Sequence, residues 1–182
     1  MKNSENGYGW LHITIHWLTA LTVLCLFIVG LWMVGLSYYS TWYHRAPLIH
    51  QSVGTLLVLL TAFRLFWRAH AGMPTSLSNH KVWEKLVAKI VHGVLYLLII
   101  SMFFSGYLIA TAKGQPFSFF GLPIPALITG IDNLEDMAAD FHEIIAFSIV
   151  IIAALHGVAA LKHHIIDKDT TLKRMLKPTS TQ

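Results

Sequence analysis

The 182-residue sequence is poor in charged residues and contains a single cysteine. Asp, Glu, Lys and Arg make up 12% of the chain, about half the share that a soluble globular domain carries. The lone Cys25 excludes an internal disulfide and any iron–sulfur or zinc site built from several thiolates. The C-x-x-C-H motif is absent, which excludes a covalently attached c-type haem. The sequence has no internal repeat and no low-complexity tract.

Apolar residues fill the place of the missing charges, at 55% of the chain and a mean hydropathy of +0.59. They form four long runs, at about residues 11–36, 47–67, 86–112 and 141–161. Each has roughly the 20 residues that a helix needs to cross a hydrocarbon core about 30 Å thick. We therefore predict an all-α protein, a four-helix transmembrane bundle in which residues 1–182 form one integral-membrane domain. No small-residue cleavage site follows the first run, so it is expected to be a retained span.

The basic residues indicate how the spans are oriented. Eleven of the thirteen lie in the N-terminal segment, around the second connection or in the C-terminal tail: Lys2, Arg64, Arg68, Lys81, Lys85, Lys89, Lys162, Lys168, Lys173, Arg174 and Lys177. The first and third connections hold only Arg45 and Lys113. The positive-inside rule then places both termini in the cytoplasm. The pI of about 9.3 is thereby explained by topology, and no nucleic-acid partner is expected.

Eleven histidines outnumber the nine acidic residues, and several lie inside the apolar runs. In the fourth span, His156 follows His142 by fourteen residues, which is about 21 Å along a helix and within about 40° of the same face. Depth in the membrane pairs His142 with His50 near the outer surface. At the inner depth, His156 can pair with His16 or with His92, and depth alone does not decide between them.

Paired imidazoles from different helices at one depth are the requirement for bis-histidine haem ligation. Gly54, Gly93 and Gly157 lie beside these histidines and would let a porphyrin approach the backbone. A single histidine in a membrane span is most often a hydrogen-bond partner between helices. Four or five histidines at matched depths favour ligation of haem over that role. Three histidines in loops are expected to be solvated: His44, His70 and His80. A haem-free transporter or proton channel is the alternative, although the inverted repeat and broken helices of many transporters are missing.

Five segments together resemble the bacterial cytochrome b-561 family of small four-span dihaem proteins, which includes membrane-bound superoxide oxidases. They are HITIHWL (12–18), LIHQSVG (48–54), IVHGVLYLL (90–98), FHEIIAFSIVIIAALHGVAALKHH (141–164) and KDTTLKRM (168–175). The resemblance implies that His16 and His156 ligate the iron of a cytoplasmic-side haem b. It implies that His50 and His142 ligate that of a periplasmic-side haem b. It thereby selects His16 over His92 at the inner depth.

The resemblance also implies a function in the bacterial inner (cytoplasmic) membrane. A quinone is expected beside the inner haem, near His163 and His92, where an imidazole can hydrogen-bond a carbonyl and exchange protons. Electrons would pass from periplasmic superoxide through both haems to ubiquinone, which makes the protein a superoxide:quinone oxidoreductase. The alternative is an electron-transfer cytochrome that links a periplasmic redox protein to the quinone pool.

The charge of the outer segments favours that alternative. Arg45 and Lys113 face five acidic residues in the outer connections and at the mouth of the fourth span, a net charge of −3: Asp132, Glu135, Asp136, Asp140 and Glu143. Such a surface does not attract an anion strongly. The connection at 113–140 is long, with prolines among its aromatic residues, and we expect it to form a lid over the outer haem.

Overall fold

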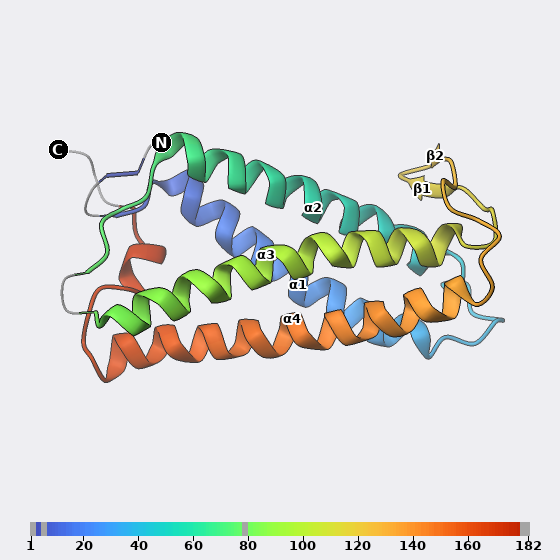
Figure 1. Ribbon diagram of the computed structural model, residues 1–182. Helices are drawn as coiled ribbons and strands as arrows, with labels where there is room; N and C mark the ends of the chain where they lie inside the picture. Colours follow the sequence, from blue (N-terminus) through green and yellow to red (C-terminus); the bar gives the residue numbers. More distant parts are fainter. Residues whose placement is uncertain (1–2, 5–6, 78–79, 179–182) are drawn as a thin grey trace. The chain divides into compact units, whose positions relative to one another are not determined.

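Four long α-helices make up most of the computed structural model, which describes residues 3–4, 7–77 and 80–178 (Figure 1). They are α1 (Trp10–Val34), α2 (Arg45–Ala71), α3 (Val82–Thr111) and α4 (Leu134–Ile165), and a short 3-10 turn, η1 (Lys173–Met175), follows them. The helices have 25 to 32 residues, and each is long and apolar enough to cross a membrane. The prediction of a helical chain with four candidate spans is confirmed. Lys2, counted above among the basic residues, lies outside the described residues.

Helix α4 extends beyond its apolar run at both ends. It begins at Leu134, with Glu135 and Asp136 in its first turn, where carboxylates interact favourably with the positive end of the helix dipole. Its last turn contains Lys162, His163 and His164, whose side chains lie at the negative end. The polar residues therefore continue the helix, and they carry His163 past the hydrophobic segment on a rigid backbone.

The distribution of side chains is the reverse of that in a soluble protein. Large apolar residues are exposed along all four helices; Leu21 on α1 and Leu155 on α4 are two examples. Several buried side chains are small and polar, and they donate to the carbonyl four residues earlier. Thr19 donates to Ile15 at 2.7 Å, and Thr111 donates to Tyr107 at 2.8 Å. Lipid covers apolar surface without cost, and small residues let helices approach closely, so this pattern is typical of a membrane protein.

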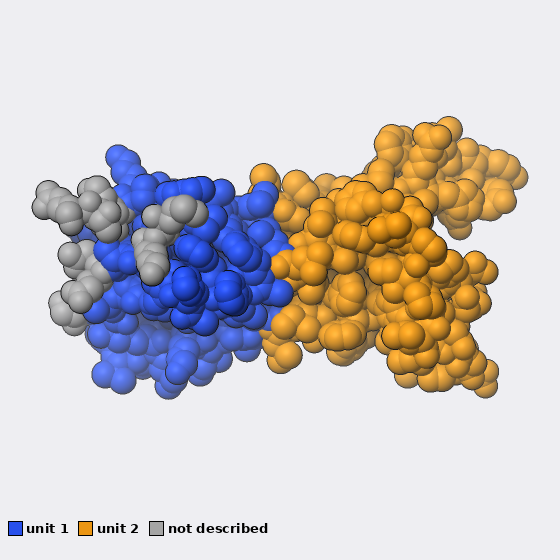
Figure 2. Space-filling view, turned by 90° about the horizontal axis from the view of Figure 1, so that it is seen from above, with its two compact units in different colours: residues 1–20, 60–96, 151–182 blue, residues 21–59, 97–150 orange. Residues whose placement is uncertain are grey.

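The chain divides into two compact units, which Figure 2 shows in different colours. Each of the four helices contributes one segment to each unit. Unit 1 comprises residues 1–20, 60–96 and 151–182, and unit 2 comprises 21–59 and 97–150. In unit 2 the buried apolar residues come from α2, α3 and α4, with α1 packed against them: Leu57, Ile99, Ile145 and Ile149, with Val23 and Leu26. In unit 1 polar contacts attach the C-terminal segment, since the Trp17 indole N–H donates to the Met175 carbonyl at 2.7 Å.

A β-hairpin forms within the long connection between α3 and α4. Its strands, β1 (Phe117–Phe119) and β2 (Leu122–Ile124), pair antiparallel. Phe117 is buried and its ring centre lies 5.8 Å from that of Tyr107 on α3. The Phe120 N–H donates to the Ser52 hydroxyl on α2 at 3.0 Å. The connection is thus anchored to α2 two residues after His50, and its role as a lid over a haem stays a prediction.

Candidate functional site

In unit 2, His50 on α2 and His142 on α4 lie close together. Their ring centroids are 6.3 Å apart, with an angle of 60° between the ring planes. Two glycines from the other helices allow this arrangement. A Cβ atom at Gly30 would lie 3.5 Å from Cε1 of His50, and one at Gly106 would lie 3.2 Å from Cε1 of His142. An added Cβ at Gly106 would press on His142, whereas one at Gly30 would make an ordinary contact with His50. Helices α1 and α3 thus form the side walls of the pair.

A serine fixes the orientation and the tautomer of His142. Ser105 Oγ lies 2.9 Å from Nδ1 of His142, and the Ser105 hydroxyl donates to the Met102 carbonyl at 3.0 Å. Because a hydroxyl has one proton to donate, the Ser105 oxygen accepts from the Nδ1–H of His142. Nε2 of His142 then keeps its lone pair free, as metal ligation requires. Nδ1 of His50 is buried and has no hydrogen-bond partner among the described residues.

Three histidines from three helices cluster in unit 1. The ring centroid of His156 on α4 lies 6.4 Å from that of His16 on α1 and 5.0 Å from that of His92 on α3. His12, one helical turn before His16, is buried and stacks on Tyr8 with ring centroids 4.5 Å apart. The structure therefore brings both of the possible inner partners of His156 next to it.

Arg64 on α2 completes this cluster and was not identified from the sequence as part of a site. Its Nη2 lies 2.8 Å from Nδ1 of His16, and its guanidinium carbon lies 5.6 Å from the ring centroid of Tyr96. A guanidinium only donates, so Nδ1 of His16 accepts this bond. A metal bound through Nε2 requires the proton on Nδ1, and the Arg64 side chain must then turn to another acceptor. Arg64 thus places a positive charge beside the inner imidazoles.

The spacing of the rings can be compared with the spacing that two imidazoles on one iron require. An imidazole nitrogen lies roughly 2 Å from the metal that it binds, with its ring centre about 1.1 Å further back, so two rings on opposite sides of one iron have centres about 6.2 Å apart. The 6.3 Å of His50–His142 and the 6.4 Å of His16–His156 fit this value. The 5.0 Å between His92 and His156 is too short. These residues fit two bis-histidine haems, with His92 as a neighbour of the inner pair.

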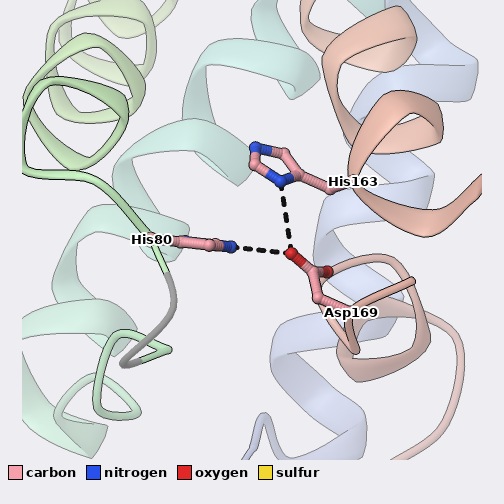
Figure 3. A group of neighbouring side chains, drawn as sticks. All are labelled: His80, His163 and Asp169. Carbon is pink, nitrogen blue, oxygen red and sulfur yellow. Dashed lines mark hydrogen bonds and ion pairs between the residues drawn. The ribbon is translucent and has the colours of Figure 1, made fainter. Parts of the chain in front are cut away.

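His163 belongs to a separate group in unit 1, together with His80 and Asp169 (Figure 3). His80 Nε2 lies 2.8 Å from Asp169 Oδ2, and His163 Nδ1 lies 3.2 Å from the same oxygen. The side chain of His80 is only 17% exposed, so the expectation that it is a solvated bystander is wrong. The sequence around His80 gave no sign of this contact, because Asp169 lies 89 residues further along the chain.

Asp169 is the anionic member of this group. Burial of its side chain acts to raise the carboxyl pKa, but hydrogen bonds from the Thr171 N–H and hydroxyl and from His80 outweigh that effect and lower the pKa to about 2. Folding that depresses a carboxyl pKa contributes stability that is fully present above the unfolded value, near 4, and is lost as the pH falls towards 2. Asp169 is therefore ionised at every physiological pH.

Comparison with known proteins identifies relatives along nearly the whole chain. A family model described as "Prokaryotic cytochrome b561" matches residues 7–178. "Cytochrome b561 homolog 2" of Escherichia coli (strain K12) is 43% identical over 180 residues, which cover 98% of this chain and 96% of the relative. "Probable superoxide oxidase CybB" of Yersinia pestis is 29% identical over 170 residues, covering 93% and 95%. "Cytochrome b562" of Cereibacter sphaeroides is 30% identical over 180 residues, covering 96% and 98%.

Replacement of Ser105 by alanine tests how the outer pair is positioned. We expect Ser105→Ala to weaken haem binding at that pair about 10- to 100-fold, the usual cost of losing a hydrogen bond to a metal-ligating histidine. The midpoint potential of the haem that remains there should rise, because His142 becomes a less basic ligand. Potentiometric titration of the visible spectrum measures both. The control is Ser148→Ala, which removes a serine hydroxyl on α4 that bonds only its own helix in the contacts described. Equal effects in the two variants would contradict the assignment.

Proposed function

The chain belongs to the prokaryotic cytochrome b561 family of haem-binding membrane proteins that transfer electrons, and from that premise we propose that it joins periplasmic superoxide oxidation to ubiquinone reduction. Two pairs of histidines carry the proposal, because the ring distances of 6.3 and 6.4 Å suit two haem irons. Bound b haems supply one-electron redox chemistry. His50 and His142 would hold one iron, and His16 and His156 would hold the other.

The proposed reaction balances with two superoxide anions for each quinone. Each superoxide loses one electron and becomes O₂, while ubiquinone gains two electrons and two protons and becomes ubiquinol. Similarity to the Yersinia pestis protein named as a probable superoxide oxidase supports this donor. With both termini in the cytoplasm, as the basic residues predict, unit 1 and its histidines lie on the side that supplies the protons.

His163 is proposed as the hydrogen-bonding group for the quinone. Its side chain is 15% exposed and its Nδ1 faces the carboxylates of Asp167 and Asp169, at 2.8 and 3.2 Å. Nε2 is then available to donate a hydrogen bond to a quinone carbonyl. His92 is the second candidate, since its ring lies beside His156.

A role as an electron-transfer subunit is the second candidate function, and an ion pair on the outer side favours it. Lys113 pairs with Glu135, and the hydrogen bond and charge of that carboxylate raise the pKa of Lys113. One of the two outer cations is therefore already paired with an acidic group, and the outer segments carry a net charge of −3. An acidic surface suits docking of a basic periplasmic redox protein better than recruitment of a small anion.

Single alanine variants test the proposed ligands. His50→Ala and His142→Ala should each lose one haem and keep the other, because the remaining imidazole lacks its partner on the opposite side of the iron. His92→Ala should keep both, because the proposal assigns the second iron to His16 and His156. A pyridine haemochrome assay of purified protein counts haem per chain. Two haems in His142→Ala, or one in His92→Ala, would refute the pairing.

Stopped-flow mixing with superoxide tests the proposed reaction itself. Haem in the isolated protein should be reduced faster than superoxide disappears spontaneously, and superoxide dismutase should abolish the reduction. The rate should increase with ionic strength, because salt screens the repulsion between superoxide and the acidic outer segments. Reduction no faster than the background would exclude the oxidase function and favour the electron-transfer subunit.

Replacement of His163 tests the quinone site. His163→Ala should keep both haems and slow quinone reduction by roughly 10²-fold, the lower end of what a proton-transfer group contributes. Steady-state reduction of a short-chain ubiquinone analogue measures the effect. His164→Ala changes the adjacent imidazole and is the matched control. Unchanged kinetics in His163→Ala would transfer the assignment to His92.

A further inference from the structure

The group formed by His80, His163 and Asp169 has the composition and spacing of a metal site. His80 lies just before α3, His163 lies in the last turn of α4, and Asp169 follows α4 (Figure 3). One ligand atom from each residue lies within 4.8 Å of the other two. We propose that these three residues bind a divalent transition-metal ion, with Zn²⁺ as the best match and water as the fourth ligand.

The distances between the ligand atoms suit a shared ion. Two atoms that each lie about 2 Å from a tetrahedral zinc are roughly 3.3 Å apart. Asp169 Oδ2 lies 2.8 Å from His80 Nε2 and 3.2 Å from His163 Nδ1. His163 Nδ1 is buried and makes no hydrogen bond within the described chain, although two carboxylate oxygens lie nearby. The two carboxylates therefore approach this nitrogen closely without forming a well-aligned hydrogen bond to it, and the nitrogen is available to a ligand between them.

The backbone holds Asp169 in position for this role. Lys168 has a left-handed conformation (φ 55°), which turns the chain back towards α4. The Asp169 N–H then donates to the His163 carbonyl at 3.1 Å. Asp169 Oδ1 accepts the Thr171 N–H at 2.7 Å, so that Oδ2 is the oxygen that faces both histidines. At zinc sites, hydrogen bonds from residues that do not touch the metal orient the carboxylate ligand in the same way.

Charge selects Asp169 among the nearby carboxylates. Lys162 Nζ lies 2.6 Å from Asp167 and 3.3 Å from Glu84, and its ammonium therefore neutralises part of the charge on both. Two imidazoles and one carboxylate remain, and this donor set is common for zinc and similar first-row metals. A pocket lined by His80, Lys81, Glu84, Lys162 and Asp167 opens beside the group and provides an entry path.

A bound ion would also affect quinone reduction, an inference that rests on the proposed function. A metal on Nδ1 of His163 leaves a fixed proton on Nε2. The imidazole can then still donate a hydrogen bond, but it cannot be reprotonated from the Asp167 and Asp169 side. Occupation of the site should therefore slow quinone reduction without displacing haem.

Direct binding of zinc tests the proposal. The full haem-loaded chain, purified in detergent with any histidine tag removed and stripped with EDTA, is titrated with ZnCl₂ by calorimetry. One Zn²⁺ per chain is expected. His80→Ala and Asp169→Asn should weaken binding about 10- to 100-fold or more, and His164→Ala should leave it unchanged. X-ray absorption at the zinc edge should show two imidazoles and no sulfur.

The opposite results overturn the proposal. Failure of the unaltered protein to bind zinc, or equal binding in His80→Ala and His164→Ala, would show that the three side chains form only a hydrogen-bonded cluster. Haem content and the visible spectrum of each variant show whether it is folded. Zinc should inhibit quinone reduction in the unaltered protein and not in His80→Ala. Tight binding of zinc without inhibition would support the metal site and reject only the proposed quinone role of His163.

Discussion

An imidazole within the hydrocarbon region of a membrane must have a partner, because lipid offers its nitrogens no hydrogen bond. Most of the site follows from that constraint. In unit 2, the Ser105 oxygen accepts a hydrogen bond from Nδ1 of His142 at 2.9 Å. In unit 1, Arg64 is within hydrogen-bonding distance of His16. One imidazole of each pair therefore has a protein group at its Nδ1, and the other nitrogen of that ring is the one that the proposed iron would use.

Most of the fold was predictable from the sequence, because the length of an apolar run sets the length of a span. The residues at which the helices begin and end were less predictable. Helix α4 begins at Leu134, seven residues before the apolar run, because carboxylates stabilise the first turn of a helix even outside the hydrophobic segment. The β-hairpin was not predicted, since strands of three residues have too little pattern to recognise. It is specified by contacts such as that between Phe120 and Ser52, which lie 68 residues apart.

The candidate site was predictable in its depth but not in its detail. The spacing of fourteen residues places His142 and His156 on one face of α4, and depth alone brings His50 to His142. Depth could not separate His16 from His92, because that choice depends on how α1 and α3 are rotated about their axes. Packing between helices sets the rotation, and it also decides which glycine touches a histidine, as Gly106 does. Contacts of this kind leave no periodic signal in one sequence.

Under the proposed ligand assignment the two pairs differ in their electrostatic surroundings, and both differences would favour an electron on the pair in unit 1. Arg64 Nη2 lies 2.8 Å from Nδ1 of His16, and the positive charge of its guanidinium would favour the reduced state of an iron held by that pair. The Ser105 oxygen accepts a hydrogen bond from His142. This bond makes the imidazole a more basic ligand, which would favour the oxidised state of an iron that it holds. On that assignment the pair in unit 2 would be the weaker electron acceptor and the pair in unit 1 the stronger one. The difference would favour the electron path proposed above, towards the proposed quinone site beside His163.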